Sequence, residues 1–253
     1  MSWIITGEQV NPAGDAQITY GITSTGGVFN LRSTGTVDYE VEWGDGTVER
    51  STSNTLAHTY AAGSYVLKIR TAQQYRPFFN NSTDGDQITS VALVSDLDVG
   101  TFLSNAWRGA NNITDFDAAF GVTTGVTIFI NTWQNCSNLT SFPLIDVSSG
   151  TVFQNAWFSC NSLTTFPANF FDSWTGTPLN NCFFRAWDGC SSLTATSVEN
   201  ILNSIDTSGR SAPASGVDIT IDYDGVGTPN ISTAVTNLIS RGWTITLNGV
   251  LQP

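Results

Sequence analysis

Charged residues are scarce in this chain. Asp, Glu, Lys and Arg together make up 12% of its 253 residues, about half the share of an average soluble protein. The net charge is −12, and the nine Lys and Arg residues form no cluster. A phosphate backbone requires clustered basic side chains, and an acidic surface repels anionic lipid. We therefore expect no nucleic-acid partner and no membrane insertion, and a surface of Ser, Thr, Asn and Gly.

The groups that usually carry chemistry are also few. The chain has one histidine and four cysteines, with no Cys-x-x-Cys pair, so a zinc site is not expected. No Cys-His or Ser-His-Asp pattern supports a nucleophile, and no glycine-rich phosphate motif is present. We predict no cofactor, no metal and no enzymatic activity.

Long apolar runs and export signals are lacking too. No run approaches the roughly 18 apolar residues of a membrane helix. Residues 1–8 contain no basic region and only a short apolar run, so we expect no secretory signal. Surfaces poor in charge are typical of extracellular and virion β-proteins. A protein with such a surface and no export signal fits assembly into a virus particle inside the cytosol.

What the chain does contain is enough apolar material for a core. Hydrophobic residues make up 40% and aromatic residues 11% of the sequence, which excludes a disordered chain. The length suits one or two domains.

A phrase of the form Trp-x-x-Cys-x-x-Leu-Thr-x-Phe-Pro recurs in the middle of the chain. Full copies begin at Trp133 and Trp157, and eroded copies begin at Trp107 and Trp187. The steps between them are 133 − 107 = 26, 157 − 133 = 24 and 187 − 157 = 30 residues. A period near 25 predicts a solenoid, in which each coil buries its apolar face against its neighbours.

Stacking would place like residues in columns. The repeat ladder consists of Trp107, Trp133, Trp157 and Trp187 with Cys136, Cys160 and Cys190. We interpret the indoles as core residues, although a column of indoles is also a candidate sugar platform. Side chains in register point in parallel, so we expect the cysteines to be free, buried thiols. A buried indole N–H needs an acceptor, and the asparagines two residues before each Trp (Asn105, Asn131 and Asn155) are the candidates.

Two further columns follow from the apolar spacing. A Leu-x-x-Phe-x-Leu frame predicts five rows, namely Ile88/Val91/Leu93, Ile113/Phe116/Ala118, Leu139/Phe142/Leu144, Leu163/Phe166/Ala168 and Leu193/Thr196/Val198. The opposite column is Leu103, Phe129, Phe153 and Phe183, each four residues before its Trp.

These units resemble leucine-rich repeats of the BspA type. Phe153, Ala156, Trp157, Cys160 and Leu163 match that family's Phe-x-x-Ala-Phe/Trp-x-x-Cys-x-x-Leu pattern, whereas Ala110 replaces the cysteine in the first unit. The resemblance implies a solenoid, and it implies adhesion because such repeats occur in bacterial surface adhesins.

The N-terminal part reads as antiparallel strands. Strands are predicted at residues 37–43 and 64–69, with a weaker one at 28–31, and a tight turn at 44–47. Trp43-Gly-Asp-Gly-Thr47, His58-Thr-Tyr60, Gly63 and Tyr65-Val66 resemble the polycystic-kidney-disease-type (PKD) domain. That resemblance implies an immunoglobulin-like β-sandwich over residues 1–72, in which His58 packs beside Trp43 and Asp45 caps backbone N–H groups.

The remaining segments are a connection and a cap. Polar residues 73–86 are predicted as a loop. Thr196 and Glu199 form a capping-box signature for a helix over 198–205, a second helix over 232–241 ends at Gly242, and strands are expected at 217–221 and 243–247. The predicted domains are the sandwich (1–72), the solenoid (73–195) and its helix–strand cap (196–253), and the fold class is mainly β.

The combination of a PKD-like domain with BspA-type repeats also resembles virion surface and fibre proteins of bacteriophages, marine cyanophages in particular. The resemblance implies a non-enzymatic structural or adhesive role in the particle, with capsid or tail proteins, and a host-surface glycan or protein, as partners. A homo-oligomer, such as a trimeric receptor-binding fibre, is one form. A capsid decoration protein with no receptor role is an alternative.

A polysaccharide-degrading enzyme is the other alternative, because paired carboxylates can cleave glycosidic bonds. The pairs are Asp115 with Asp117, Asp96 with Asp98, and Asp222 with Asp224. Asp222, Asp224 and Gly225 also match half of a calcium loop, as do residues 84–86. We interpret all of them as turn or strand-edge residues that satisfy local backbone N–H groups.

The strand rows predict one candidate interaction surface. Residues that alternate with the buried ones face outward, and that face is small, polar and mostly uncharged. Its predicted members are Asp115, Asp117, Ser141, Pro143, Thr165 and Pro167, flanked by Ser90/Ala92 on one side and Ala195/Ser197 on the other.

Overall fold

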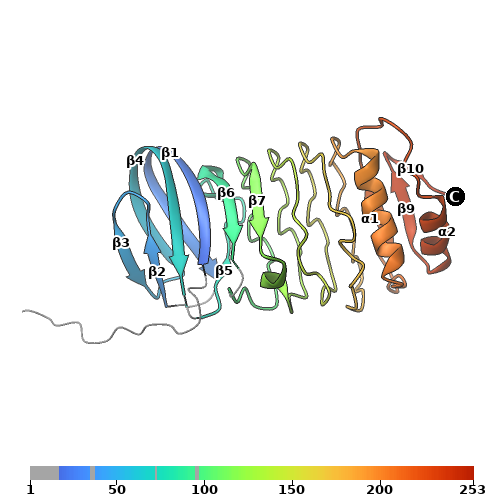
Figure 1. The fold of residues 1–253 in the computed structure, drawn as a ribbon, viewed down its shortest axis with the longest axis horizontal. Coiled ribbons are helices and arrows are strands. Elements are labelled where there is room, and N and C mark those ends of the chain that lie inside the picture. Colours follow the sequence, from blue (N-terminus) through green and yellow to red (C-terminus); the bar gives the residue numbers. More distant parts are fainter. Residues whose placement is uncertain (1–16, 35–37, 72, 95–96) are drawn as a thin grey trace, which may run out of the picture.

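The computed structural model describes residues 17–34, 38–71, 73–94 and 97–253 of the chain, and the fold is mainly β. The described part is elongated. A sheet of long strands lies at one end, a series of narrow loops of chain follows, and a small helix–strand unit closes the other end (Figure 1). None of the helices in the described ranges has the length and apolarity needed to cross a membrane.

Two long strands form the centre of the N-terminal sheet. β1 (Gln17–Thr34) pairs antiparallel with β4 (Thr55–Arg70) along almost the whole of both strands. β2 (Tyr39–Glu42) pairs with β4, and β3 (Val48–Ser51) pairs with β2 at the margin. The predicted turn at 44–47 joins β2 to β3, and both of its glycines have positive φ angles.

This sheet continues into the repeat region. β6 (Ile88–Leu93) pairs antiparallel with the first part of β1, and β7 (Asp115–Ala118) pairs parallel with β6. The strand order is therefore β3-β2-β4-β1-β6-β7. The N-terminal module and the first repeat rows share one hydrogen-bonded sheet instead of being joined by a flexible connection.

The predicted loop over residues 73–86 is mostly irregular chain, but it contains two short elements. β5 (Arg76–Pro77) pairs with the end of β1, and η1 (Gly85–Gln87) is a short 3₁₀ helix. Between them, the backbone N–H groups of Phe79 and Asn81 donate to the carbonyls of Ala106 and Arg108 at 2.9 and 2.6 Å. The segment is polar because its outer side meets solvent, but Phe79 is buried and the backbone pairs as part of the stack.

The N-terminal strands were placed correctly, but two were bounded too narrowly, and the one predicted at 37–43 is wider than β2. Residues 28–31 lie inside β1, residues 64–69 lie inside β4, and the first of the residues at 37–43 falls outside the described part. The described strands of this region belong to one sheet. A sandwich of two sheets over residues 1–72 therefore stays a prediction.

Between β6 and α1 (Ala195–Thr207) the chain forms loops that lie side by side along the molecule (Figure 1), and this stretch also contains β7 and a short 3₁₀ helix, η2 (Phe120–Thr123). Backbone hydrogen bonds connect each loop, which we call a coil, to the next. The N–H groups of Trp107, Trp133 and Trp157 donate to Thr132, Ala156 and Ala186 at 2.9, 2.9 and 3.0 Å. Repetition of these bonds at the same place in each coil fixes the register of the stack.

The C-terminal unit covers the last coil. It contains α1, β8 (Asp218–Ile221), α2 (Ser232–Ser240), β9 (Thr244–Leu247) and β10 (Val250–Leu251), and β8 runs parallel to β9. A parallel bridge between Trp187 and Ile221 joins the unit to the stack. The helices and strands of this unit were thus predicted at the correct places. Gly242, which was predicted to end the second helix, follows α2 and has a φ angle of 90°.

The start of the first helix differs from the prediction. The N-cap is Thr194, whose hydroxyl accepts a hydrogen bond from the N–H of Ser197. The proposed capping box at Thr196 and Glu199 is therefore wrong by two residues. Because the helix begins earlier, the fifth predicted strand row does not form, and Ala195 and Ser197 lie in the first turn of α1.

Candidate functional surface and the buried columns

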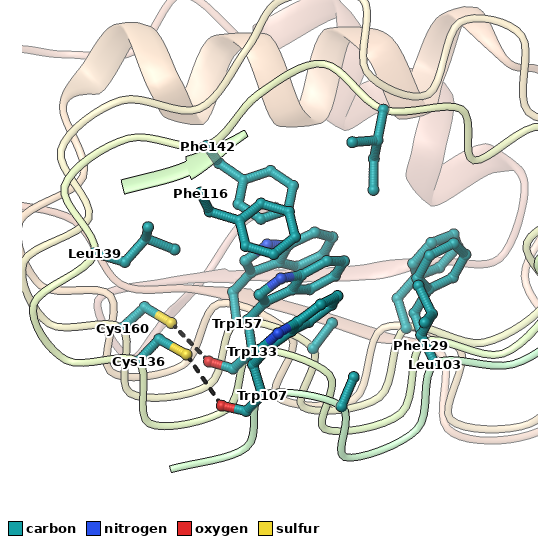
Figure 2. Packing of buried hydrophobic residues seen from close by; sticks show 14 of the residues in the cluster. Leu103, Trp107, Phe116, Phe129, Trp133, Cys136, Leu139, Phe142, Trp157 and Cys160 are labelled. Atoms are coloured by element: carbon teal, nitrogen blue, oxygen red, sulfur yellow. Dashed lines mark hydrogen bonds between the residues drawn. The ribbon is translucent and has the colours of Figure 1, made fainter. Parts of the chain in front are cut away.

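The four tryptophans of the repeat form a buried column. Ring centroids of successive indoles lie 6.0, 5.5 and 5.3 Å apart, with interplanar angles of 14°, 9° and 7°. Figure 2 shows the indoles of Trp107, Trp133 and Trp157 stacked face to face inside the coils. Each is at most 1% exposed. The prediction that they are core residues is confirmed, and they are not available as a sugar platform.

Phenylalanine columns flank the indoles on two sides. Phe129, Phe153 and Phe183 stack at 5.1 and 5.5 Å, as the repeat predicted. On the other side Phe116 and Phe142 stack at 5.6 Å (Figure 2), and their rings stand almost perpendicular to the neighbouring indoles. Offset stacks and edge-to-face contacts are the favoured aromatic geometries, so this core is well packed in all directions.

The prediction that asparagines accept from the indole N–H groups is wrong. The Nε1 atoms of Trp133, Trp157 and Trp187 have no hydrogen-bond partner among the described residues. The asparagines instead bond to one another, because Nδ2 of Asn131 donates to Oδ1 of Asn105, and Nδ2 of Asn155 donates to Oδ1 of Asn131, each at 3.0 Å.

Backbone conformation explains these asparagines. Asn105, Asn131 and Asn155 have φ angles of 60°, 56° and 51°, and Arg185 in the same position has 55°. Left-handed backbone strains most residues but is tolerated by Asn and Gly. A second left-handed position lies four residues later, at Gly109, Asn135, Ser159 and Gly189. The recurrence of Asn and Gly at these two positions was the sequence signal for tight turns in every coil.

The repeat cysteines are free, buried thiols, as predicted. The Sγ atoms of Cys136, Cys160 and Cys190 donate to the carbonyls of Trp107, Trp133 and Trp157 in the preceding coil, at 3.3, 3.1 and 3.1 Å. Figure 2 shows two of these bonds. Burial raises the pKa of each thiol. A protonated, shielded thiol is a poor nucleophile, so these residues act as small packing groups and hydrogen-bond donors.

We expect the four cysteines to be unreactive in the folded protein. A thiol reagent at neutral pH should label none of them before unfolding and all four in denaturant, because burial removes both access and thiolate. Mass spectrometry of the labelled protein measures this. Labelling of Cys160 in the native state would contradict the buried column.

The third position of the predicted rows is wrong in two coils. Leu144 is 40% exposed and Ala168 is exposed, whereas Ile145 is buried. After Phe142 the chain departs from regular strand geometry, so the alternation of inward and outward residues ends there. The prolines at 143 and 167 cannot donate a backbone hydrogen bond, which is consistent with this departure.

The predicted interaction surface is present as an exposed face of the coils. Asp115 and Asp117 on β7 are exposed, as are Ser141 and Thr165, which face each other across a parallel bridge. Pro143 and Pro167 are partly exposed. The face ends at α1, where the prediction that Ser197 points outward is wrong. Its side chain is buried, and its hydroxyl donates to the carbonyl of Thr164 at 3.0 Å.

Two of the three carboxylate pairs contain aspartates that bind backbone N–H groups. Asp222 accepts from the N–H of Gly189 at 2.9 Å, and Asp224 accepts from the N–H of Val226 at 2.8 Å. Asp222 thus binds a segment that is distant in the sequence, whereas Asp224 caps a local N–H group, as the turn interpretation predicted. Asp98 accepts from Gly100 at 2.7 Å in the same manner, and its partner Asp96 lies outside the described residues.

The partial calcium loop at residues 84–86 has a structural use. Asp84 is buried and accepts from the side chains of Asn30 at 3.0 Å and Arg32 at 3.0 Å. Asp86 accepts from the side chain of Asn111 at 3.0 Å. Across the part of the chain that the structure describes, no three His, Cys, Asp or Glu residues gather as metal ligands do.

The only histidine lies in an aromatic cluster. The His58 ring stacks on Trp43 with centroids 4.4 Å apart, and its Nε2 lies 2.8 Å from Oδ2 of Asp45. Asp45 also accepts from the hydroxyl and the N–H of Thr47. These bonds, with the Thr47 contributions largest and His58 next, lower the pKa of Asp45 to about 2. His58 and Asp45 therefore have the packing and capping roles that we expected.

Acid should weaken this turn. A lowered pKa means that folding favours the charged Asp45, so its contribution to stability is complete above the ordinary value of 3.8 and is lost as the pH falls through about 2. We expect Asp45→Asn to lower the thermal unfolding midpoint at pH 7. Scans from pH 7 to pH 2 should show the two midpoints converging, and a difference that persists unchanged at pH 2 would contradict this origin.

Comparison of the chain with models of known protein families, with curated proteins and with solved structures gave no match. The likenesses to BspA-type repeats and PKD domains therefore depend on the motifs quoted above.

Proposed function

We propose that this chain is a structural or adhesive protein of a virus particle, built from a PKD-type module and a short BspA-type leucine-rich-repeat solenoid with a helix–strand cap. In this proposal it performs no catalysis. It holds a rigid surface away from the particle for contact with a host surface or with another protein.

The observation that carries the proposal is the continuity between the two parts. The sheet runs through β1, β6 and β7 without interruption, and the coils then repeat the same backbone bonds up to the cap. Such an arrangement resists bending between the modules, because relative motion would break ladder hydrogen bonds. A rigid spacer with a distinct module at one end suits attachment at that end and presentation along the rest.

The placement of reactive groups also supports a non-catalytic role. The thiols, the indoles and His58 all take part in packing, and Asp222 and Asp224 cap backbone groups. The exposed strand face consists of carboxylate, hydroxyl and proline side chains that the backbone spaces one coil apart. In our proposal the N-terminal sheet attaches to the particle, and this face points toward the host or solvent.

The test uses the purified full chain, fluorescently labelled, with bacterial cells that include cyanobacteria and with purified cyanophage particles. Saturable binding to cells that excess unlabelled protein abolishes supports a receptor-binding role. Saturable binding to particles alone supports a decoration protein. Release of new reducing ends from cell-envelope polysaccharide would overturn the proposal in favour of a depolymerase, and binding to neither cells nor particles would also overturn it.

A further inference from the structure

We propose that the exposed strand face binds a neutral, linear polysaccharide that lies along the stack, so that successive sugar units meet successive coils. The inference rests on the adhesive function proposed above, because it names the class of ligand for that function. It concerns the face formed by residues 114–117, 140–143 and 164–167, which we call the hydroxyl face.

Polar side chains form columns on the hydroxyl face. Thr114, Thr140 and Thr164 occupy the same place in three coils, and all are exposed. The neighbouring column is Asp115, Ser141 and Thr165, also exposed, with a parallel bridge between the last two. Adjacent strands lie about 4.8 Å apart, a distance comparable to the length of one pyranose unit. A sugar chain along the columns would therefore find the same groups at each step.

Two threonine hydroxyl protons of this face are directed at a carbonyl of the preceding coil. Oγ1 of Thr164 donates to the carbonyl of Thr140 at 2.9 Å, and Oγ1 of Thr114 donates to the carbonyl of Thr89 at 3.3 Å. A threonine hydroxyl has one proton and two lone pairs, so these two oxygens present lone pairs to the outside. The carboxylates of Asp115 and Asp117 are acceptors as well. Thr114, Thr164 and the two carboxylates therefore offer acceptors to the outside. The other hydroxyls of the face, on Thr140, Ser141 and Thr165, can accept or donate. Such a face suits a ligand that carries many O–H groups.

The charge of the hydroxyl face limits the class of ligand further. Residues 111–118, 137–143 and 161–167 contain no Lys or Arg, whereas Asp115 and Asp117 contribute negative charge. A sulfated, phosphorylated or uronic-acid polymer would be repelled, and the chain's own net charge of −12 opposes a second copy on this face. A neutral polysaccharide has the donors that the face requires and no charge that it repels.

Exposed apolar side chains border the hydroxyl face. Phe120 is 54% exposed and Leu144 is 40% exposed, at the end of the strand face where Pro143 and Pro167 also lie. The N–H of Asp146 donates to the carbonyl of Phe120 at 3.1 Å, which places the two segments on neighbouring coils. Sugar rings have apolar C–H faces beside their hydroxyls, so a ligand of this kind can cover both the acceptor columns and this margin.

The experiment is affinity electrophoresis of the full chain in gels that contain hydroxyethyl cellulose, galactomannan, alginate or dextran sulfate. A fifth gel contains neutral polysaccharide extracted from cells that the protein binds. We expect retardation by at least one neutral polymer and by neither anionic polymer. The variant Ser141→Ala/Thr164→Val/Thr165→Val, which removes three acceptors at nearly constant volume, should bind at least about tenfold more weakly.

The matched control lies on another side of the same coils. Thr127 and Thr151 donate to Thr101 and Thr127 at 3.0 and 2.9 Å, with the geometry of the Thr164 bond. Thr127→Val/Thr151→Val should therefore alter stability in the same way and leave retardation unchanged. Comparable circular dichroism of both variants shows that the fold is retained.

The outcomes separate this inference from the function on which it rests. Absence of retardation by every neutral polymer, equal retardation by anionic ones, or unchanged binding by the triple variant would each overturn the inference. If saturable cell binding persists in that variant, the adhesive function stands and the face has been misassigned. If protease treatment of the cells abolishes binding, the partner is a protein and the inference also fails.

Discussion

Trp157→Ala is expected to destabilise the protein by about 3–5 kcal/mol, the usual cost of removing a large buried aromatic side chain. Trp157 lies in the middle of the column, with Trp133 and Trp187 at 5.5 and 5.3 Å, and Phe166 stands against it edge to face. A domain is commonly stable by about 5–15 kcal/mol in total, so this loss should bring the chain close to unfolding. Chemical denaturation monitored by circular dichroism measures it.

Two variants control for this experiment. Trp157→Phe keeps an aromatic ring in the column and should cost distinctly less than alanine, because part of the stacking and less cavity volume remain. Phe184→Ala removes a side chain that is 39% exposed and should cost least of the three. Equal stability of Trp157→Ala and wild type would show that the indoles do not hold the coils together.

Deletion of one whole coil, residues 133–156, is expected to leave a folded protein. The step from Trp133 to Trp157 is 24 residues, so the deletion joins Thr132 to Trp157 in the register that Thr132 and Trp133 have now. Coils contact mainly their immediate neighbours, and the loss of one removes an interface without exposing the ends. We expect cooperative unfolding at a lower midpoint, with the β-type circular dichroism spectrum retained.

Deletion of half a coil, residues 133–144, should have the opposite result. It removes a tryptophan and a phenylalanine from their columns. Polar residues would then lie at positions that pack against the apolar side chains of the neighbouring coils. We expect an insoluble or unfolded product. If both deletions fold equally well, or neither does, the stacking register is not what determines the structure of this region.

The sequence was most informative where one residue type recurs in one environment. The period of the Trp-x-x-Cys phrase predicted the column of indoles, the column of thiols and the opposite phenylalanine column, and the coordinates confirm all three. The packing of a repeat can be predicted without knowing a distant partner segment, because each coil packs against a coil of nearly the same sequence. The exposed positions of Asp115, Asp117, Ser141 and Thr165 followed from the same alternation.

The asparagines were assigned the wrong role for a physical reason. Asparagine can accept from an indole N–H, cap a turn or adopt left-handed backbone, and its identity alone does not choose among these. The φ angles of 51–60° show that these positions require a residue that tolerates left-handed backbone. In that backbone conformation, Nδ2 of Asn131 lies 3.0 Å from Oδ1 of Asn105. Hydrogen bonds between asparagines of successive coils therefore satisfy the side-chain amides.

The junction between the modules could not be predicted from local patterns. The pairing of β1 with β6 joins Ile18 to Leu93, residues that are far apart in the chain. Polar composition made residues 73–86 resemble a loop, although their backbone pairs with the first coil and Phe79 is buried. The choice of strand partner depends on the arrangement of the whole sheet. The local sequence of a half-buried strand is compatible with pairing to several other strands.

The sequence by itself determined the columns of indoles, thiols and phenylalanines, the strand-rich composition and the two-helix cap, because apolar periodicity reports which side chains leave water. Only the tertiary structure decided that one sheet joins the N-terminal module to the coils, that Thr194 and not Thr196 begins α1, and that Leu144 faces solvent. These features depend on backbone hydrogen bonds between distant segments, and every residue except proline carries the same backbone donor and acceptor.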